Sequence, residues 1–326
     1  MSHAVNLEQA AQLLARGHVV AIPTETVYGL AADATQPKAI LKVFEIKRRP
    51  LEHPLIVHLA DPEGIFHWSA HLPRFASILI EHFMPGPLTI VTRRPPHVAK
   101  EITGGRDSVA LRVPAHPLTR ALIQRLGELR SLPYPAIAAP SANRFGSVSP
   151  TCAAHVHADF HGEDLGVLDG GLCSAGIEST IVDCTKEVPT ILRLGAIPQE
   201  AIDGVLGMRV PVETHGDVRA PGMLPAHYAP RAKVVVASSL SEFQSLSQKL
   251  RESYRFVASI GAPRELSSEF NHSIPWSDDM EANARALYST LRHLDDLGVE
   301  AVLVLLPPLS GLGAAIADRL LRASKA

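Results

Sequence analysis

The sequence predicts an α/β protein with two folded units joined by a linker. Over residues 1–208, amphipathic helical segments alternate with many short apolar runs, which predicts a mixed α/β domain with a multi-stranded sheet. Over residues 233–326, apolar strands and helices alternate strictly, which favours a small parallel sheet of Rossmann-like type. Residues 209–232 have no hydrophobic period and are predicted to be the linker, although a flexible tether would not need His227 and Tyr228.

Three helices are predicted in the first unit. Residues 6–17 have the apolar spacing of a helix, and Gly17 supplies a C-cap. Residues 36–49 form an amphipathic helix that must end before Pro50. A third helix, 72–84, stops at a Pro-Gly-Pro sequence. The other apolar runs are strands or strand ends: 18–23, 54–60, 88–94, 108–114, 136–143, 166–171, 179–184 and 190–195.

The second unit begins after the linker. Its predicted strands are 233–237, 255–261 and 300–308. Its predicted helices are 239–253, 278–298 and 312–325.

The bulk composition, with 46% apolar and 20% charged residues, is that of a globular protein. No run of about 18 apolar residues occurs, and the N-terminus has no signal-peptide pattern, so neither a membrane span nor secretion is expected. The cysteines, Cys152, Cys173 and Cys184, form no CxxC pair, which favours a reducing cytoplasm. The net charge of −2 is spread evenly, so composition does not predict nonspecific nucleic-acid binding.

The sequence Thr24-Glu25-Thr26 is the first candidate site, because it follows the apolar run 18–23. A plain turn at this place would use Asn, Gly or Pro. Hydroxyls and a carboxylate at the exit of a buried strand instead indicate a pocket for a polar ligand.

Cationic side chains form a second group of candidates. Lys47, Arg48 and Arg49 close a predicted helix, where they either neutralise its C-terminal dipole or form a clamp for a polyphosphate. Arg112 lies inside an apolar strand, where a cation is costly unless it is paired. Its partner is either a buried carboxylate of the protein or the carboxylate of a ligand.

Small polar residues at strand ends form a third group. Ser141 and Asn143 fit either a ligand site at the edge of a sheet or a helix cap or turn. Ser179 and Thr180 open an apolar strand, and Arg193 lies near the end of the next one. These three residues either contact a ligand or form cross-strand hydroxyl pairs and a surface cation.

Familiar cofactor motifs are weak or missing. The sequence HVHADFH, residues 155–161, does not follow a known pattern of metal ligands. Gly311 and Gly313 follow an apolar strand, but Ile316 occupies the third glycine position of a dinucleotide fingerprint. The sequence has no Walker P-loop, so any use of ATP proceeds without one.

Eight short motifs occur in one order along the chain. They are PTETVYGLAADA, KRRP followed by HPLIVH, PGPLT, SVALRVPAHP, APSAN, ESTIVD, LRLG and PGMLPAHYAP. In this order the sequence closely resembles the threonylcarbamoyl-AMP synthases, the YrdC-like family, in their long two-domain form. The resemblance covers about residues 8–232 and extends to GLGAAIADRL near the end.

The resemblance implies both fold and activity. It implies a YrdC-like catalytic domain with a twisted multi-stranded sheet over residues 1–208, and a linker, 209–232, that acts as a lid over the active site. Members of the family join L-threonine, bicarbonate and ATP into threonylcarbamoyl-adenylate and pyrophosphate, and Mg²⁺ accompanies ATP. A separate TsaD-type transferase then passes the activated group to a tRNA adenosine.

The resemblance also implies roles for individual residues. The implied pocket for L-threonine comprises Thr26, His58, Arg112, Ala139 and Ser179. Contacts to ATP are implied for Lys47, Arg49, His53, Ser108, Ser141, Asn143, Ser149, Arg193 and Tyr228. His53 is a departure, because many relatives have Asn-Pro-Leu where this chain has His-Pro-Leu, and an imidazole donates with different geometry and charge.

Two other functions compete with this one. A basic face that binds tRNA directly is the first, with candidate residues Lys42, Lys47, Arg48, Arg49, Arg93 and Arg94. The near-neutral charge weighs against RNA as the main ligand. A transferase that uses carbamoyl-phosphate is the second, but related proteins of that kind carry acylphosphatase and zinc-finger segments that this sequence lacks.

Overall fold

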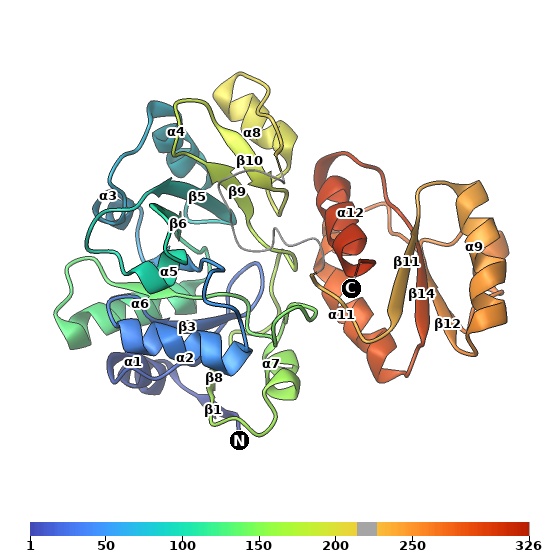
Figure 1. Cartoon of the computed structure of the whole chain (residues 1–326), viewed down its shortest axis with the longest axis horizontal. Coiled ribbons are helices and arrows are strands. Elements are labelled where there is room, and N and C mark those ends of the chain that lie inside the picture. The colour runs from blue at the N-terminus through green and yellow to red at the C-terminus, as the bar shows by residue number, and fades with distance from the viewer. Residues whose placement is uncertain (214–226, 326) are drawn as a thin grey trace. The chain divides into compact units, whose positions relative to one another are not determined.

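The computed structural model describes residues 1–213 and 227–325, which form two compact units (Figure 1). The first unit comprises Met1–Phe145 and Ser149–Met223, and the second comprises Gly146–Val148 and Leu224–Ala326. Residues 214–226 of the predicted linker and lid lie outside the described residues. Within the described part of the chain, no helix is long and apolar enough to cross a membrane.

A mixed ten-stranded sheet runs through the first unit, in the order β1-β8-β2-β3-β7-β4-β6-β5-β9-β10. The strands are β1 (His3–Val5), β2 (Val20–Ile22), β3 (Gly29–Asp33), β4 (Ile56–Leu59), β5 (Leu88–Arg93), β6 (Ser108–Arg112), β7 (Ala136–Ala138), β8 (Gly166–Leu168), β9 (Thr180–Asp183) and β10 (Thr190–Arg193). Strand β8 pairs in parallel with β1 and β2, as do β4 with β6 and β5 with β9; the other pairs are antiparallel. The predicted mixed α/β domain is confirmed.

Helices cover both faces of this sheet (Figure 1). They are α1 (Leu7–Ala15), α2 (Pro37–Lys47), α3 (Glu63–Trp68), α4 (Arg74–Phe83), α5 (Lys100–Thr103), α6 (Pro117–Arg130), α7 (Ala153–Asp159) and α8 (Gln199–Leu206). Because successive side chains of a strand point to opposite faces, Val20 and Ile22 of β2 pack with α1 and α6, whereas Ala21 packs in the cluster that contains α2 and α4. The core is therefore divided between the two faces.

Local sequence explains how α1 begins and ends. The side chain of Asn6 accepts the N–H of Gln9, and the Gln9 side chain accepts the N–H of Asn6, which forms a capping box. Gly17 follows the helix with a φ of 75°, a conformation that favours glycine. Sequence and structure agree here because the signals lie within a few residues of one another.

Helix α6 is not among the predicted helices. Pro117 occupies its first turn, and Leu122, Ile123 and Leu126 are buried, so the usual features of an amphipathic helix are present. Its position, packed against α1, places the buried side chains over one face of the sheet.

The second unit contains a four-stranded parallel sheet in the order β11-β14-β12-β13, which confirms the predicted parallel sheet. Its strands are β11 (Lys233–Ala237), β12 (Val257–Ile260), β13 (His272–Ile274) and β14 (Ala301–Leu305). Its helices are α9 (Leu240–Ser253), α10 (Arg264–Ser267), α11 (Met280–Asp296) and α12 (Gly311–Ala323). Phe243 of α9 and the neighbouring Phe270 lie in its core.

Candidate active site

The Thr-Glu-Thr sequence forms a buried turn between β2 and β3. The hydroxyl of Thr24 lies 2.9 Å from that of Thr26 and accepts the main-chain N–H groups of Thr26 (3.1 Å) and Val27 (3.2 Å). Thr24 also donates to the carbonyl oxygen of Val27 (2.6 Å). Thr24 therefore closes the turn, and the turn fixes Glu25 and Thr26, which are 8% and 1% exposed.

Arg112, the last residue of β6, is the centre of a buried polar cluster. It donates from Nε to the carbonyl oxygen of Gly86 (3.2 Å) and from Nη1 to the hydroxyl of Thr26 (2.9 Å). Its Nη2 lies 2.7 Å from Oε1 of Glu25. Of the two partners considered for Arg112, a carboxylate of the protein is therefore present.

The Glu25–Arg112 pair is charged although it is buried. Burial opposes ionisation of Glu25, but the positive charge of Arg112 and its hydrogen bond outweigh this effect and lower the pKa of the carboxyl group below its ordinary value. A guanidinium has more N–H donors than these three protein contacts use. Arg112 can therefore meet a second carboxylate without losing the first.

His58 lies opposite Arg112 in the parallel register of β4 and β6. Its Nδ1 is 3.2 Å from the carbonyl oxygen of Ile56, which also accepts the main-chain N–H of Ala139 (3.0 Å). A carbonyl oxygen only accepts, so the ring carries its proton on Nδ1 and leaves Nε2 as an acceptor. Burial and the charge of Arg112 lower the pKa of His58 to about 3, which keeps the ring neutral.

A neutral His58 makes the stability of the first unit depend on pH. Between the native pKa of about 3 and the unfolded value of about 6.5, only the unfolded chain binds the proton, so stability falls as the pH falls through this range. Compared with His58→Asn, the protein should lose about 2 kcal/mol more between about pH 7 and pH 5. Urea unfolding followed by Trp68 fluorescence, in a Trp276→Phe background, measures this unit because each unit holds one tryptophan. Equal losses in both proteins would rule out a neutral His58.

Ser179 immediately precedes β9 and is fixed by two neighbours. Its hydroxyl lies 2.7 Å from that of Thr89, and Nη2 of Arg193 donates to the same hydroxyl (3.0 Å) and to the Ser179 carbonyl oxygen (2.8 Å). Beside it, the Ser149 hydroxyl donates to the carboxylate of Glu178 (2.7 Å). The cross-strand hydroxyl pair considered from the sequence is present, but Arg193 is buried and is not a surface cation.

Lys47, the last residue of α2, joins two of the predicted motifs. Its Nζ donates to the carbonyl oxygens of Ser141 (2.5 Å) and Asn143. The carbonyl oxygen of Lys47 accepts the main-chain N–H of Phe145 (3.1 Å). Burial, reinforced by the charge of Arg49, lowers the pKa of Lys47 well below its ordinary value. Lys47 thus fixes the loop after β7 beside the end of α2.

The chain reverses directly after Lys47, at Arg48, whose φ is 54°. Arg49 then lies over the ring of Phe145, 5.5 Å from its centre, and donates to the carbonyl oxygen of Pro54 (3.0 Å). The ring of His53 is 5.4 Å from the same phenylalanine ring. The basic sequence, the His-Pro-Leu sequence and the loop after β7 therefore form one local structure.

The predicted site residues fall into several groups. The structure links Thr26, Arg112, His58 and Ala139 in one group, Lys47, Ser141 and Asn143 in a second, Arg49 and His53 in a third, and Ser179 and Arg193 in a fourth. Ser108 begins β6, at the end of the strand away from Arg112, and pairs with Arg93 of β5. Tyr228 belongs to the second unit, where it is buried next to Tyr288 and Arg319.

Three residues without an assigned role contact the predicted ones. Glu25 pairs with Arg112, Thr89 with Ser179, and Glu178 with Ser149. All three lie inside motifs that the sequence analysis singled out, namely TET, PGPLT and ESTIVD. The sequence analysis had these residues inside its motifs but could not show which residues they contact. Thr89 and Ser179 are 90 residues apart along the chain, and Ser149 and Glu178 are 29 apart, so spacing does not reveal such pairs.

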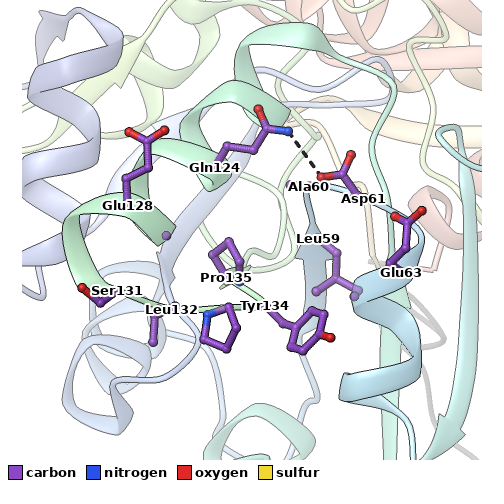
Figure 2. A pocket seen from close by; sticks show the side chains of 13 residues that line it. Leu59, Ala60, Asp61, Glu63, Gln124, Glu128, Ser131, Leu132, Tyr134 and Pro135 are labelled. Carbon is purple, nitrogen blue, oxygen red and sulfur yellow. Dashed lines mark hydrogen bonds between the residues drawn. The ribbon is translucent and has the colours of Figure 1, made fainter.

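A cavity of about 680 Å³ lies elsewhere on the first unit (Figure 2). It lies among the end of β4, the start of α3, the C-terminal half of α6 and the loop after α6. Asp61, Glu63 and Glu128 place carboxylates around it, and Tyr134 places an aromatic ring beside them. None of the predicted site residues lines this cavity, so it is separate from the predicted site.

The described residues, 1–213 and 227–325, contain no ready-made metal site. In these residues, no group of three or more His, Cys, Asp or Glu side chains is placed to hold a metal ion. In the HVHADFH sequence, Nδ1 of His157 lies 2.9 Å from the hydroxyl of Ser2.

Comparison with known proteins covers nearly the whole chain. A family model described as Telomere recombination matches residues 12–195, and one described as Threonylcarbamoyl-AMP synthase, C-terminal domain, matches residues 197–325. The Threonylcarbamoyl-AMP synthase of Pyrococcus abyssi is 40% identical over 325 residues, which are 97% of this chain and 93% of that protein. The Bacillus subtilis protein of the same name is 37% identical over 330 residues, 98% and 92% of the two chains. The crystal structure of P. abyssi Sua5 complexed with L-threonine matches with a TM-score of 0.88 at 38% identity, over 100% of this chain and 96% of that one.

Proposed function

The chain belongs to the threonylcarbamoyl-AMP synthase family, and from this membership we propose that it is an L-threonylcarbamoyladenylate synthase. It converts L-threonine, bicarbonate and ATP into threonylcarbamoyl-AMP, pyrophosphate and water, for the N6-threonylcarbamoyladenosine modification of tRNA. The observation that carries this proposal is 40% identity over almost the full length of a synthase of that name. A relative with L-threonine bound, at a TM-score of 0.88, adds support for the amino-acid substrate.

The threonine pocket is proposed around Arg112. Its remaining N–H groups would bind the substrate carboxylate, a geometry for which a guanidinium is well suited. The hydroxyls of Thr26 and Ser179, the free Nε2 acceptor of His58 and the main chain at Ala139 would complete the pocket. The hydrogen bond from Arg112 to Thr26 and the register of His58 opposite Arg112 support this assignment.

The nucleotide site is proposed around Lys47. Lys47, Arg49, Ser141 and Asn143 would surround the phosphates, and the link from Lys47 to the loop of Ser141 and Asn143 supports their joint role. Further ATP contacts are proposed for His53, Ser108, Ser149, Arg193 and Tyr228. We propose Mg²⁺ as the accompanying ion, held mainly by ATP itself, where it would neutralise phosphate charge.

The chemistry requires no protein nucleophile. The threonine amine adds to bicarbonate or CO₂ to give a carbamate, and a carbamate oxygen then attacks the α-phosphorus of ATP while pyrophosphate leaves. The protein has to position the two reactants and compensate charge. The buried guanidinium of Arg112 in the proposed threonine pocket, and the buried Lys47 and Arg49 in the proposed nucleotide site, are suited to this task.

We propose that the product passes to a separate TsaD-type transferase and that the protein acts in the cytoplasm, a proposal that the three free cysteines support. Direct contact with tRNA remains a prediction. Several cations of the proposed basic face already bond to main-chain carbonyl oxygens: Lys42 to Gly17, Lys47 to Ser141, Arg49 to Pro54 and Arg94 to Val98. These contacts weaken the case for RNA as the main ligand, and a steep salt dependence of tRNA affinity would restore it.

The test of the proposed function is pyrophosphate release from ATP. Release that requires both L-threonine and bicarbonate, with L-serine as the control substrate, is the expected result. Mass spectrometry should identify threonylcarbamoyl-AMP as the accompanying product. Absence of threonine-dependent pyrophosphate release would overturn the proposal, and direct tRNA binding would then become the favoured function.

A further inference from the structure

We propose that Glu25 is a positioning residue of the threonine site, whose carboxylate fixes the guanidinium of Arg112 in the orientation that receives the substrate carboxylate. This inference rests on the proposed function, because it takes Arg112 as the group that binds threonine. It concerns a residue that touches Arg112 rather than the reacting atoms.

Glu25 is held firmly on both its sides. The Thr24 hydroxyl closes the turn that carries it, and the main-chain oxygen of Glu25 accepts the N–H of Ala175 (2.7 Å). The residue is only 8% exposed. A group that positions another must itself be fixed by surrounding structure, and Glu25 meets this condition.

Arg112 depends on Glu25 for one of its three contacts. The carbonyl oxygen of Gly86 accepts from Nε and the hydroxyl of Thr26 accepts from Nη1. Nη2 lies 2.7 Å from the Glu25 carboxylate. Without that carboxylate, one end of a long, rotamer-rich side chain would be released. Threonine binding would then have to order the guanidinium, which lowers affinity.

The pair also balances the charge of the pocket. His58 is neutral, and burial raises the pKa of Cys173 to about 12, so its thiol is neutral as well. Glu25 therefore supplies the negative charge that offsets Arg112. Threonine carries one charge of each sign at neutral pH, so it enters this pocket without adding net buried charge.

A competing effect has the opposite sign. The carboxylates of Glu25 and of threonine repel each other, and removal of Glu25 would tighten threonine binding if repulsion dominated. Both carboxylates, however, would bond to the same guanidinium through different N–H groups. The shared cation reduces their repulsion, so we expect the loss of orientation to be the larger effect.

Calorimetric titration with L-threonine measures this role. The dissociation constant should rise about tenfold in Glu25→Ala, and about threefold in Glu25→Gln, because the amide keeps the size of the side chain and a partial negative charge on the oxygen that faces Nη2. The affinity for ATP should stay within about twofold of the original in both. In an Arg112→Ala background, Glu25→Ala should change kcat/KM for threonine less than about twofold, because a residue that acts through Arg112 has nothing left to position.

Glu8→Ala is the matched control. It removes a carboxylate from the half-buried ion pair with Arg125 (2.8 Å), which joins α1 to α6 in the same unit, and should leave threonine binding unchanged. Normal or tighter threonine binding by both Glu25 variants, or an undiminished Glu25→Ala effect without Arg112, would overturn the inference. If Glu25→Ala does not fold, the near-isosteric Glu25→Gln decides alone. Failure of the unmodified protein to bind threonine would overturn the proposed function itself. If Arg112→Ala weakens threonine binding but both Glu25 variants bind threonine normally, only this inference is overturned.

Discussion

Replacing Arg112 by alanine is expected to lower kcat/KM for L-threonine about 10²–10³-fold. The side chain is 3% exposed and bonds at once to Gly86, Thr26 and Glu25. Its removal takes away the proposed partner of the substrate carboxylate and leaves a buried carboxylate without its cation. Pyrophosphate release at varied threonine, with saturating ATP and bicarbonate, measures the loss.

Two further variants show whether the loss belongs to the threonine site. Arg112→Lys keeps the positive charge but not the fork of donors, so it should recover only part of the activity. Arg125→Ala removes a guanidinium from a half-buried pair with Glu8 and should retain full activity. Calorimetric ATP binding by Arg112→Ala separates a local defect from unfolding. Retention of most of kcat/KM by Arg112→Ala would contradict a carboxylate site at this residue.

The fold was predictable where local sequence controls it. The apolar run 233–237 became β11 with the same bounds, and Asn6, Gln9 and Gly17 delimit α1 through contacts within a few residues. Strand β3 was not predicted, because Gly29 and its alanines have weak strand propensity. It is a strand because β2 and β7 provide hydrogen-bond partners on both its edges, which is tertiary information.

The site was predictable as a set of residues but not as a set of contacts. Motif order selected Lys47 and Ser141, yet the residues lie 94 positions apart and spacing does not show that one bonds to the other. For Arg112, the cost of burying a cation predicted that a partner exists but did not distinguish Glu25 from a ligand. Pairing of distant residues depends on strand order, and the sequence alone did not determine that order.

Replacing Lys47 by methionine is expected to lower kcat/KM for ATP about 10²-fold and the free energy of unfolding of the first unit by about 2–4 kcal/mol. Methionine keeps an apolar stem but cannot donate a hydrogen bond. The carbonyl oxygens of Ser141 and Asn143 would lose a buried donor, and the loop with two proposed ATP contacts would lose its link to α2. Pyrophosphate release at varied ATP gives the first quantity, and urea unfolding gives the second.

The same helix supplies the control for this prediction. Nζ of Lys42 also donates to a carbonyl oxygen, that of Gly17 (2.7 Å), but the residue is exposed, so Lys42→Met should keep the ATP kinetics and cost less than about 1 kcal/mol. Lys47→Arg should not restore activity, because the larger guanidinium does not fit a buried ammonium site. If Lys47→Met loses stability but keeps kcat/KM for ATP, the lysine only holds the loop, and Arg49 becomes the main cation for the phosphates. Loss of both quantities is the expected result, because the loop that Lys47 holds carries the proposed ATP contacts of Ser141 and Asn143.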